Sequence, residues 1–514
     1  MDKKRATVIT VTIVLAVIAI VFGYMGYPVN GTNDAVAFVA PAINFALHHE
    51  LTSPVTRKTD AITDPSGQWR LLFYPPLFPM AISLFISPSP FDSGPKGPGE
   101  PHIPLSYPRQ AFLALGIMNA LALFLTSLIF YKVATMHNKK LSWFAVAFIV
   151  AASLITVRVS WGFGGRPEIL ARLFVAAGLL LMLYAKRRAT RIEILALLLG
   201  LMAATHPGGT VLFALVVGMF FSLEYRSRDA LRDTAFTYLL GGLAFLLVMQ
   251  VSPFGIYETF SGIAREAIGN TAALGGGSSG AHLLRVLVSD FKSPYRILYF
   301  LMMVLVLIFC ITIYRKRLRD IASPLLFACF SVAFAGLMAY FANDSRNSYV
   351  TLFFVLALAA LLYYVIHISG MRTVQYGTLA VMLFLAAASA QPIVIFPFFI
   401  KNGVSMDAAR NAFEKISRAS PAAIYIPSSH AWTLSENYNA MDTLGDFGPN
   451  DALPPRAMIL WGQTQDDYYA LAAPPDVRGC PLIESNFVGK IPEAFGIRLA
   501  PATPSYAFAA YACP

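Results

Sequence analysis

Long apolar runs recur over residues 6–400, and they constrain the fold of this chain more than any other feature. Each holds about 15 to 25 residues, close to the length that a helix needs to cross a bilayer. Only helices or closed barrels pair all their backbone polar groups inside hydrocarbon, and continuous rather than alternating apolar sequence selects helices. With 57% hydrophobic and 13% charged residues and a mean hydropathy of +0.61, the chain is predicted to be an all-α polytopic membrane protein.

We predict about eleven transmembrane helices, at residues 6–26, 109–131, 141–157, 169–185, 192–205, 210–224, 234–251, 297–314, 321–341, 349–368 and 374–400. A cleaved signal peptide is the alternative for the first, because Lys3, Lys4 and Arg5 precede an apolar run. No clear A-x-A cleavage site follows, which favours an uncleaved anchor. Residues 77–86 are too short to span and lie between prolines, so we expect an interfacial or re-entrant segment.

The distribution of Lys and Arg predicts the orientation. The connections on the side of the N-terminus hold 18 of the 39 basic residues and 6 of the 28 acidic ones, so they are expected to be cytoplasmic. The first outer loop, 27–108, and the C-terminal region then face the periplasm or the cell exterior, with the chain in the inner (plasma) membrane. Because this topology accounts for the net charge of +11, we expect membrane lipids and no nucleic acid as partners.

Two domains are expected. Residues 1–400 form the transmembrane domain, and residues 401–514, with more Pro, Gly and short β-prone runs, form a small extracytoplasmic α/β domain. Cys480 and Cys513 are the only cysteines of the second domain, and an oxidising compartment would allow them to pair. Cys310 and Cys329 lie in apolar spans, where a small buried hydrophobic side chain is the ordinary interpretation.

Polar side chains gather at the predicted outer ends of the helices. Asp34 lies in the first outer loop, Arg166 and Glu168 in the second, His206 in the third outer turn, and Arg346 in the fifth. The spans themselves carry few charges away from their ends. This pattern favours a site at the outer interface over a conduction path through the bilayer.

Each of these residues also has a purely structural interpretation. Asp34 suits the N-cap of a helix over residues 35–47, and Glu168 is spaced for a local ion pair with Arg172. Arg166 could anchor the helix at the interface, and His206 could simply occupy a turn. Spacing alone does not decide between these interpretations and a functional site.

Three segments in order resemble the GT-C membrane glycosyltransferases. They are 31–35 (Gly-Thr-Asn-Asp-Ala), 73–79 (Phe-Tyr-Pro-Pro-Leu-Phe-Pro) and 165–170 (Gly-Arg-Pro-Glu-Ile-Leu). The chain looks most like the branch of protein O-mannosyltransferases and lipid A aminoarabinose transferases, which use polyprenyl-phosphate sugars. The resemblance covers roughly residues 6–225.

The resemblance implies roles for individual residues. Asp34 would be the general base for an acceptor that attacks the anomeric carbon, with inversion. Arg166, His206 and Arg346 would offset the charge on the departing lipid phosphate. Where relatives often carry Lys-Pro, this chain has His206 before Pro207, whose charge would depend on pH.

Further residues are assigned to supporting roles by the same resemblance. Glu168 would orient a base or help to hold a divalent cation, Mg²⁺ or Mn²⁺. Tyr74, Pro75 and Pro76 would line the groove for the lipid and the acceptor. The expected function is hexosyl or pentosyl transfer to a lipid, glycan or protein acceptor.

Two other classes of function stay open at this point. A flippase or transporter of lipid-linked saccharide would need polar residues near the bilayer midplane and inverted repeats, which we do not find. A non-catalytic assembly or sensor protein would show no dependence on Asp34.

Overall fold

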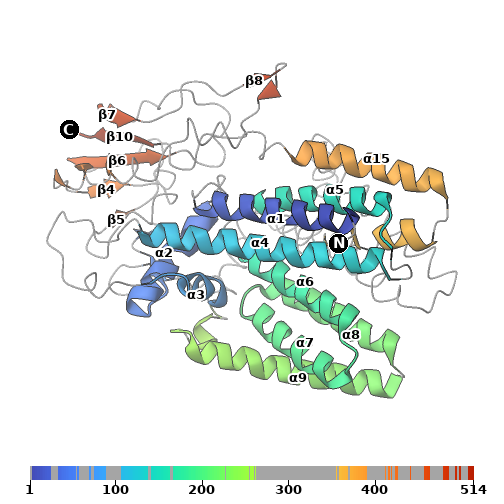
Figure 1. Cartoon of the computed structure of the whole chain (residues 1–514). Coiled ribbons are helices and arrows are strands. Elements are labelled where there is room, and N and C mark those ends of the chain that lie inside the picture. The colour runs from blue at the N-terminus through green and yellow to red at the C-terminus, as the bar shows by residue number, and fades with distance from the viewer. Residues whose placement is uncertain are drawn as a thin grey trace, which may run out of the picture.

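The computed structural model is mostly helical in the part of the chain that it describes (Figure 1). It describes residues 3–24, 33–53, 55–56, 69–70, 75–87, 106–136, 140–162, 166–225, 227–253, 255–259, 261, 355, 358–359, 361–368, 371–390, 411–412, 415–416, 418–419, 423–425, 440–441, 456–462, 479–485, 493–494, 497–498 and 508–514. Within these residues, Lys3–Val21, Ser106–Ala134 and Arg228–Val251 are long and apolar enough to cross a membrane.

Helices lie at most of the predicted spans. Their bounds are α1 Lys3–Tyr24, α2 Asn33–His48, α3 Leu77–Ser83, α4 Ser106–Ala134, α5 Trp143–Gly162, α6 Glu168–Tyr184, α7 Arg188–Ala203, α8 Pro207–Glu224, α9 Ser227–Val251 and α15 Arg372–Ser389. A π-helix, η1, covers Tyr364–Ile368. The predicted spans 297–314 and 321–341 lie outside the described residues, and 349–368 is described only in part.

Basic side chains lie over aromatic rings at one end of the helical bundle, which we call the basic end. The pairs are Lys4 over Trp143, Arg5 over Tyr131, Lys132 over Tyr184, Arg188 over Tyr225 and Arg191 over Phe220. Cation–π contacts of this kind suit the interface between bilayer and water, where an aromatic ring has one apolar and one wet side. These residues belong to the connections that the charge distribution places on the cytoplasmic side.

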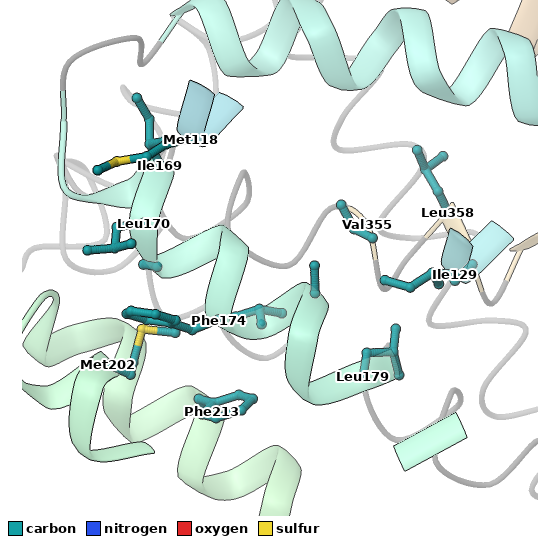
Figure 2. Close-up of a cluster of buried hydrophobic side chains, with 14 of the residues drawn as sticks. Met118, Ile129, Ile169, Leu170, Phe174, Leu179, Met202, Phe213, Val355 and Leu358 are labelled. Atoms are coloured by element: carbon teal, nitrogen blue, oxygen red, sulfur yellow. The ribbon is translucent and has the colours of Figure 1, made fainter. Parts of the chain in front are cut away.

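Helix α6 packs between two groups of helices. Figure 1 shows α1, α4, α5 and α15 on one side of it and α7, α8 and α9 on the other. Its buried apolar residues lie in one cluster with Met118 of α4, Met202 of α7 and Phe213 of α8 (Figure 2). Gly178 permits the close approach of α8, because a Cβ atom there would lie 2.7 Å from the ring of Phe213.

The end of the bundle opposite the basic end is stepped. Lys132 of α4 lies 4.4 Å from the ring centroid of Tyr184 at the end of α6. Both helices rise about 1.5 Å per residue, so Glu168 at the start of α6 lies level with about Gly116 of α4. Residues 106–115 of α4 therefore extend about 15 Å beyond the start of α6. The first turn of α6 is recessed within the bundle.

Helices α2 and α3 pack at this recessed end. Phe38 of α2 and Phe78 of α3 contact each other edge to face at 5.3 Å. The main-chain N–H of Leu77 donates a hydrogen bond to the carbonyl of Ala204, just after α7, at 3.0 Å. The N–H of Ser87 donates to Oε1 of Gln110 near the start of α4, at 2.9 Å. Helix α3 therefore runs from the turn after α7 to the extended part of α4, and its seven residues are too few to span a bilayer, as predicted.

A six-stranded sheet lies near the C-terminus, in the order β2-β5-β4-β6-β10-β7. Its strands are β2 Val55–Thr56, β4 Ala423–Tyr425, β5 Ala440–Met441, β6 Ala457–Gly462, β7 Leu482–Ser485 and β10 Phe508–Ala512. The pairs from β2 to β6 are parallel, and β10 pairs antiparallel with both β6 and β7. A disulfide joins Cys480, before β7, to Cys513, after β10.

The first loop contributes an edge strand to this sheet. Val55 of β2 is in register with Ala440 of β5, although the sequence assigned the two segments to different domains. Two small sheets complete the strands: β1 Thr52–Ser53 with β3 Trp69–Arg70, and β8 Glu493–Ala494 with β9 Ile497–Arg498. The segment between α2 and α3 is thus attached to the C-terminal sheet.

Candidate functional site

Glu168 is the centre of a charged cluster at the recessed end of the bundle. It is the first residue of α6, directly after Pro167, and its side chain is fully buried. An acidic residue suits this position because the positive end of the helix dipole favours negative charge. Its Oε1 atom lies 3.3 Å from Nε of Arg166 and 3.9 Å from Nε2 of His206. The structure thus brings together three residues that the sequence predicted for one site.

Arg172 belongs to the same cluster. It lies one turn further along α6, is 4% exposed, and donates a hydrogen bond from Nε to the main-chain carbonyl of Glu168 at 3.3 Å. Its guanidinium also interacts electrostatically with the Glu168 carboxylate. By contrast, Arg166 is 27% exposed. The sequence considered Arg172 only as a local partner of Glu168, but a buried cation within an apolar helix was the signal for a larger role.

His206 is held as a neutral hydrogen-bond donor. It occupies the N-cap of α8, where its Nδ1 atom accepts from the N–H of Gly209 at 2.8 Å. Because Nδ1 accepts, the proton of the neutral ring is on Nε2, the atom that faces Glu168. Burial lowers the pKa of His206 below its usual value, although the charge of Glu168 acts in the opposite direction. The expectation of a pH-dependent cation is therefore replaced by a neutral ring that donates through Nε2.

The Pro-Pro segment reaches the cluster through the main chain. Pro75 and Pro76 are buried, and Leu77, which follows them, donates to the carbonyl of Ala204, two residues before His206. Tyr74, predicted to line the same groove, lies outside the described residues. The sequence gave no indication of the contact between Leu77 and Ala204.

The electrostatics of the cluster favour an anion. The N-termini of α6 and α8 both lie here, and their exposed N–H groups and dipoles attract negative charge. Two guanidinium groups add positive charge, against the single carboxylate of Glu168. Arg166 is the partly exposed cation through which an anionic group could be bound.

The donor set around Glu168 does not suit a divalent cation. Its neighbours Arg166 and Arg172 are positively charged and have no lone pair to offer a metal. Among the described residues, no group of three or more His, Cys, Asp or Glu side chains could hold a metal ion. We therefore derive no step through Mg²⁺ or Mn²⁺ at Glu168.

Two predicted site residues are placed only by their position in the chain. Helix α2 begins at Asn33, so Asp34 lies in its first turn and not at the N-cap of a helix starting at residue 35. Phe38, one turn later, contacts Phe78 of α3, so α2 and α3 connect the position of Asp34 to the cluster. Arg346 lies outside the described residues.

Comparisons with known proteins give two solved structures of slight similarity. No protein-family model matches the sequence, and no curated protein matches it. The apo crystal structure of the Archaeoglobus fulgidus oligosaccharyltransferase aligns with a TM-score of 0.46, and the A. fulgidus oligosaccharyltransferase AglB in complex with an inhibitory peptide and a dolichol-phosphate aligns with 0.44. Each is 13% identical and covers 84% of this chain, which spans 64% of the other's length. We base no inference on a likeness of this size.

Proposed function

We propose that this protein is a membrane glycosyltransferase that moves a sugar from a polyprenyl-phosphate donor to an acceptor at the recessed end of the bundle. The observation that carries the proposal is the cluster of Arg166, Glu168 and His206 beside the buried Pro75 and Pro76. The order of motifs that resembles the GT-C glycosyltransferases supports the same reaction. By the distribution of Lys and Arg, this end is the outer face of the membrane.

The cluster would bind the phosphate of the donor. A guanidinium has five N–H donors in a planar fork, so Arg166 can contact Glu168 and a phosphate together. The Nε2–H group of His206 is a second, uncharged donor on the same side of Glu168. Negative charge grows on the lipid phosphate as the glycosidic bond breaks, and donors fixed beforehand stabilise that charge without having to reorient.

Asp34 would activate the acceptor. Its carboxylate takes the proton of the acceptor hydroxyl or amide as that group attacks the anomeric carbon. The new bond forms on the face opposite the phosphate, which leaves with the electron pair of the broken C–O bond, so the configuration inverts. The first turn of α2 suits this role because α2 packs on α3, whose first residue bonds the turn before His206.

Transfer by the purified protein tests this proposal. Donors would be polyprenyl-phosphate hexoses and pentoses, acceptors would be lipid, oligosaccharide and protein, and the readout would be release of polyprenyl phosphate with labelled product. We expect Asp34→Asn to lower turnover by about a hundredfold or more, as for loss of a general base. Glu50→Gln is the matched control, because Glu50 is an exposed carboxylate beyond the other end of α2.

Two results would contradict the proposal. Full activity of Asp34→Asn, in a variant that remains monodisperse, would remove Asp34 from the role of base. Absence of transfer with every donor and acceptor class would remove the enzyme function itself.

A further inference from the structure

We infer that Arg172 is a positioning residue, which keeps the Glu168 carboxylate ionised and so holds Arg166 and the Nε2–H of His206 ready for a phosphate. This inference rests on the proposed function, because it concerns the same site. Arg172 acts through Glu168 and not by contact with the substrate.

The position of Arg172 calls for a reason beyond packing. It is 4% exposed, and its neighbours Leu170, Phe174 and Val175 along α6 are all buried apolar residues (Figure 2). A charged side chain in an apolar, bundle-facing helix is unfavourable unless a partner compensates it, and such residues tend to mark functional sites. Glu168 is the partner that the structure places one turn away.

Arg172 is well placed to stabilise a charged Glu168. A fully buried carboxylate takes up a proton unless positive charge or hydrogen-bond donors compensate its burial. Arg172 donates from Nε to the main-chain oxygen of Glu168 and interacts with its carboxylate. The N-terminus of α6 adds to this compensation, because Glu168 is the first residue of the helix.

The two arginines divide the work by their exposure. Arg166 is 27% exposed and contacts Oε1 of Glu168 through Nε at 3.3 Å, so it can also reach a bound anion. Arg172 is buried, so its charge can act on the anion only by balancing that of Glu168. With Arg172 present, the positive charge of Arg166 is not cancelled by Glu168.

Removal of Arg172 has two possible consequences at Glu168, and both weaken phosphate binding. If Glu168 takes up a proton, it loses its charge-assisted contact with Arg166 and its attraction for the Nε2–H of His206. If it stays ionised, it neutralises Arg166. A merely structural Arg172, serving only as a spacing-favoured partner within α6, would change helix stability and leave phosphate binding as it was.

The experiment compares the full-length protein with Arg172→Met and Arg172→Lys in nanodiscs. The probe is a short-chain polyprenyl phosphate without sugar, titrated by calorimetry. We expect Arg172→Met to weaken binding by about tenfold to a hundredfold, the range seen for residues that support a binding site indirectly. Arg172→Lys restores the charge and should recover most of the affinity. Lys132→Met, which removes a cation at the basic end, should have no effect.

A second measurement reports on Glu168 without any substrate. Infrared spectra of Arg172→Met should show the carbonyl band of a protonated carboxylic acid or a weaker binding of phosphate with the carboxylate band unchanged, and the acid band should vanish in Arg172→Met combined with Glu168→Gln. Wild-type affinity in a folded Arg172→Met variant overturns the inference alone. If the wild-type protein neither binds the polyprenyl phosphate nor transfers sugar, the proposed function and this inference both fail.

Discussion

His206 offers a substitution that separates the stability of a helix from the chemistry of the site. Its Nδ1 atom caps α8 by accepting from Gly209 at 2.8 Å, whereas its Nε2 atom faces Glu168. In His206→Ala both interactions are lost. In His206→Asn the side-chain oxygen can still accept from Gly209, because Asn is a preferred N-cap residue, but no donor reaches Glu168 in place of Nε2.

The two variants should therefore differ in stability and agree in activity. Loss of an N-cap typically lowers the free energy of unfolding by about 1 kcal/mol, so we expect His206→Ala to be less stable by that amount and His206→Asn to be close to the wild type. A hydrogen bond to a charged group contributes about 1.5 to 3 kcal/mol, so both variants should lower the rate of donor consumption by about tenfold to a hundredfold.

Thermal unfolding in detergent and release of polyprenyl phosphate are the two assays. Equal activity of His206→Asn and wild type would refute the role of Nε2 as a donor to the phosphate. Equal stability of His206→Ala and wild type would refute the cap. If activity followed stability across both variants, His206 would be a structural residue and not part of the site.

Three further predictions follow from the described structure. Because burial lowers the pKa of His206 in the folded protein, the unfolded chain binds the proton first, so acidification below about pH 6.5 should lower the unfolding temperature more in the wild type than in His206→Asn. Gly200→Ala should destabilise the packing of α7 on α9 by about 1 to 3 kcal/mol, since the new Cβ would lie 2.6 Å from a main-chain oxygen of α9; Gly242→Ala, with nothing within 4 Å, is the neutral control in calorimetry. Reduction of the Cys480–Cys513 bond, which closes 33 residues, should destabilise the C-terminal sheet by about 2 to 4 kcal/mol, measured by protease resistance of that region; unchanged resistance would contradict its structural role.

The helices could be predicted from sequence because a bilayer leaves the chain few alternatives. The predicted span 169–185 is found as Glu168–Tyr184, and 210–224 as Pro207–Glu224. Hydrocarbon requires both an apolar composition and a paired backbone, so composition alone marks the helix. The helix starts also follow local chemistry, since Pro167 and Pro207 each stand where a helix begins.

The contacts that assemble the site could not be predicted in this way. The bond from Leu77 to Ala204 joins two main-chain groups, which every residue carries, so no side chain indicates it. The same holds for the pairing of Val55 with Ala440. The tautomer of His206 depends on the N–H of Gly209, a group whose position is set by the start of α8. Sequence identified candidates for the site, and the packing of α3 and α6 to α8 decided which of them lie together.

The central claim is that the cluster around Glu168 is the binding site for a lipid phosphate. The most direct test is the affinity of the purified protein for a short-chain polyprenyl phosphate, with Arg166→Met compared with Lys132→Met. Each variant removes one cation, Arg166 beside Glu168 and Lys132 at the opposite, basic end. We predict that Arg166→Met weakens binding by about tenfold to a hundredfold and that Lys132→Met binds as the wild type does. Equal affinity of Arg166→Met and wild type would contradict the claim.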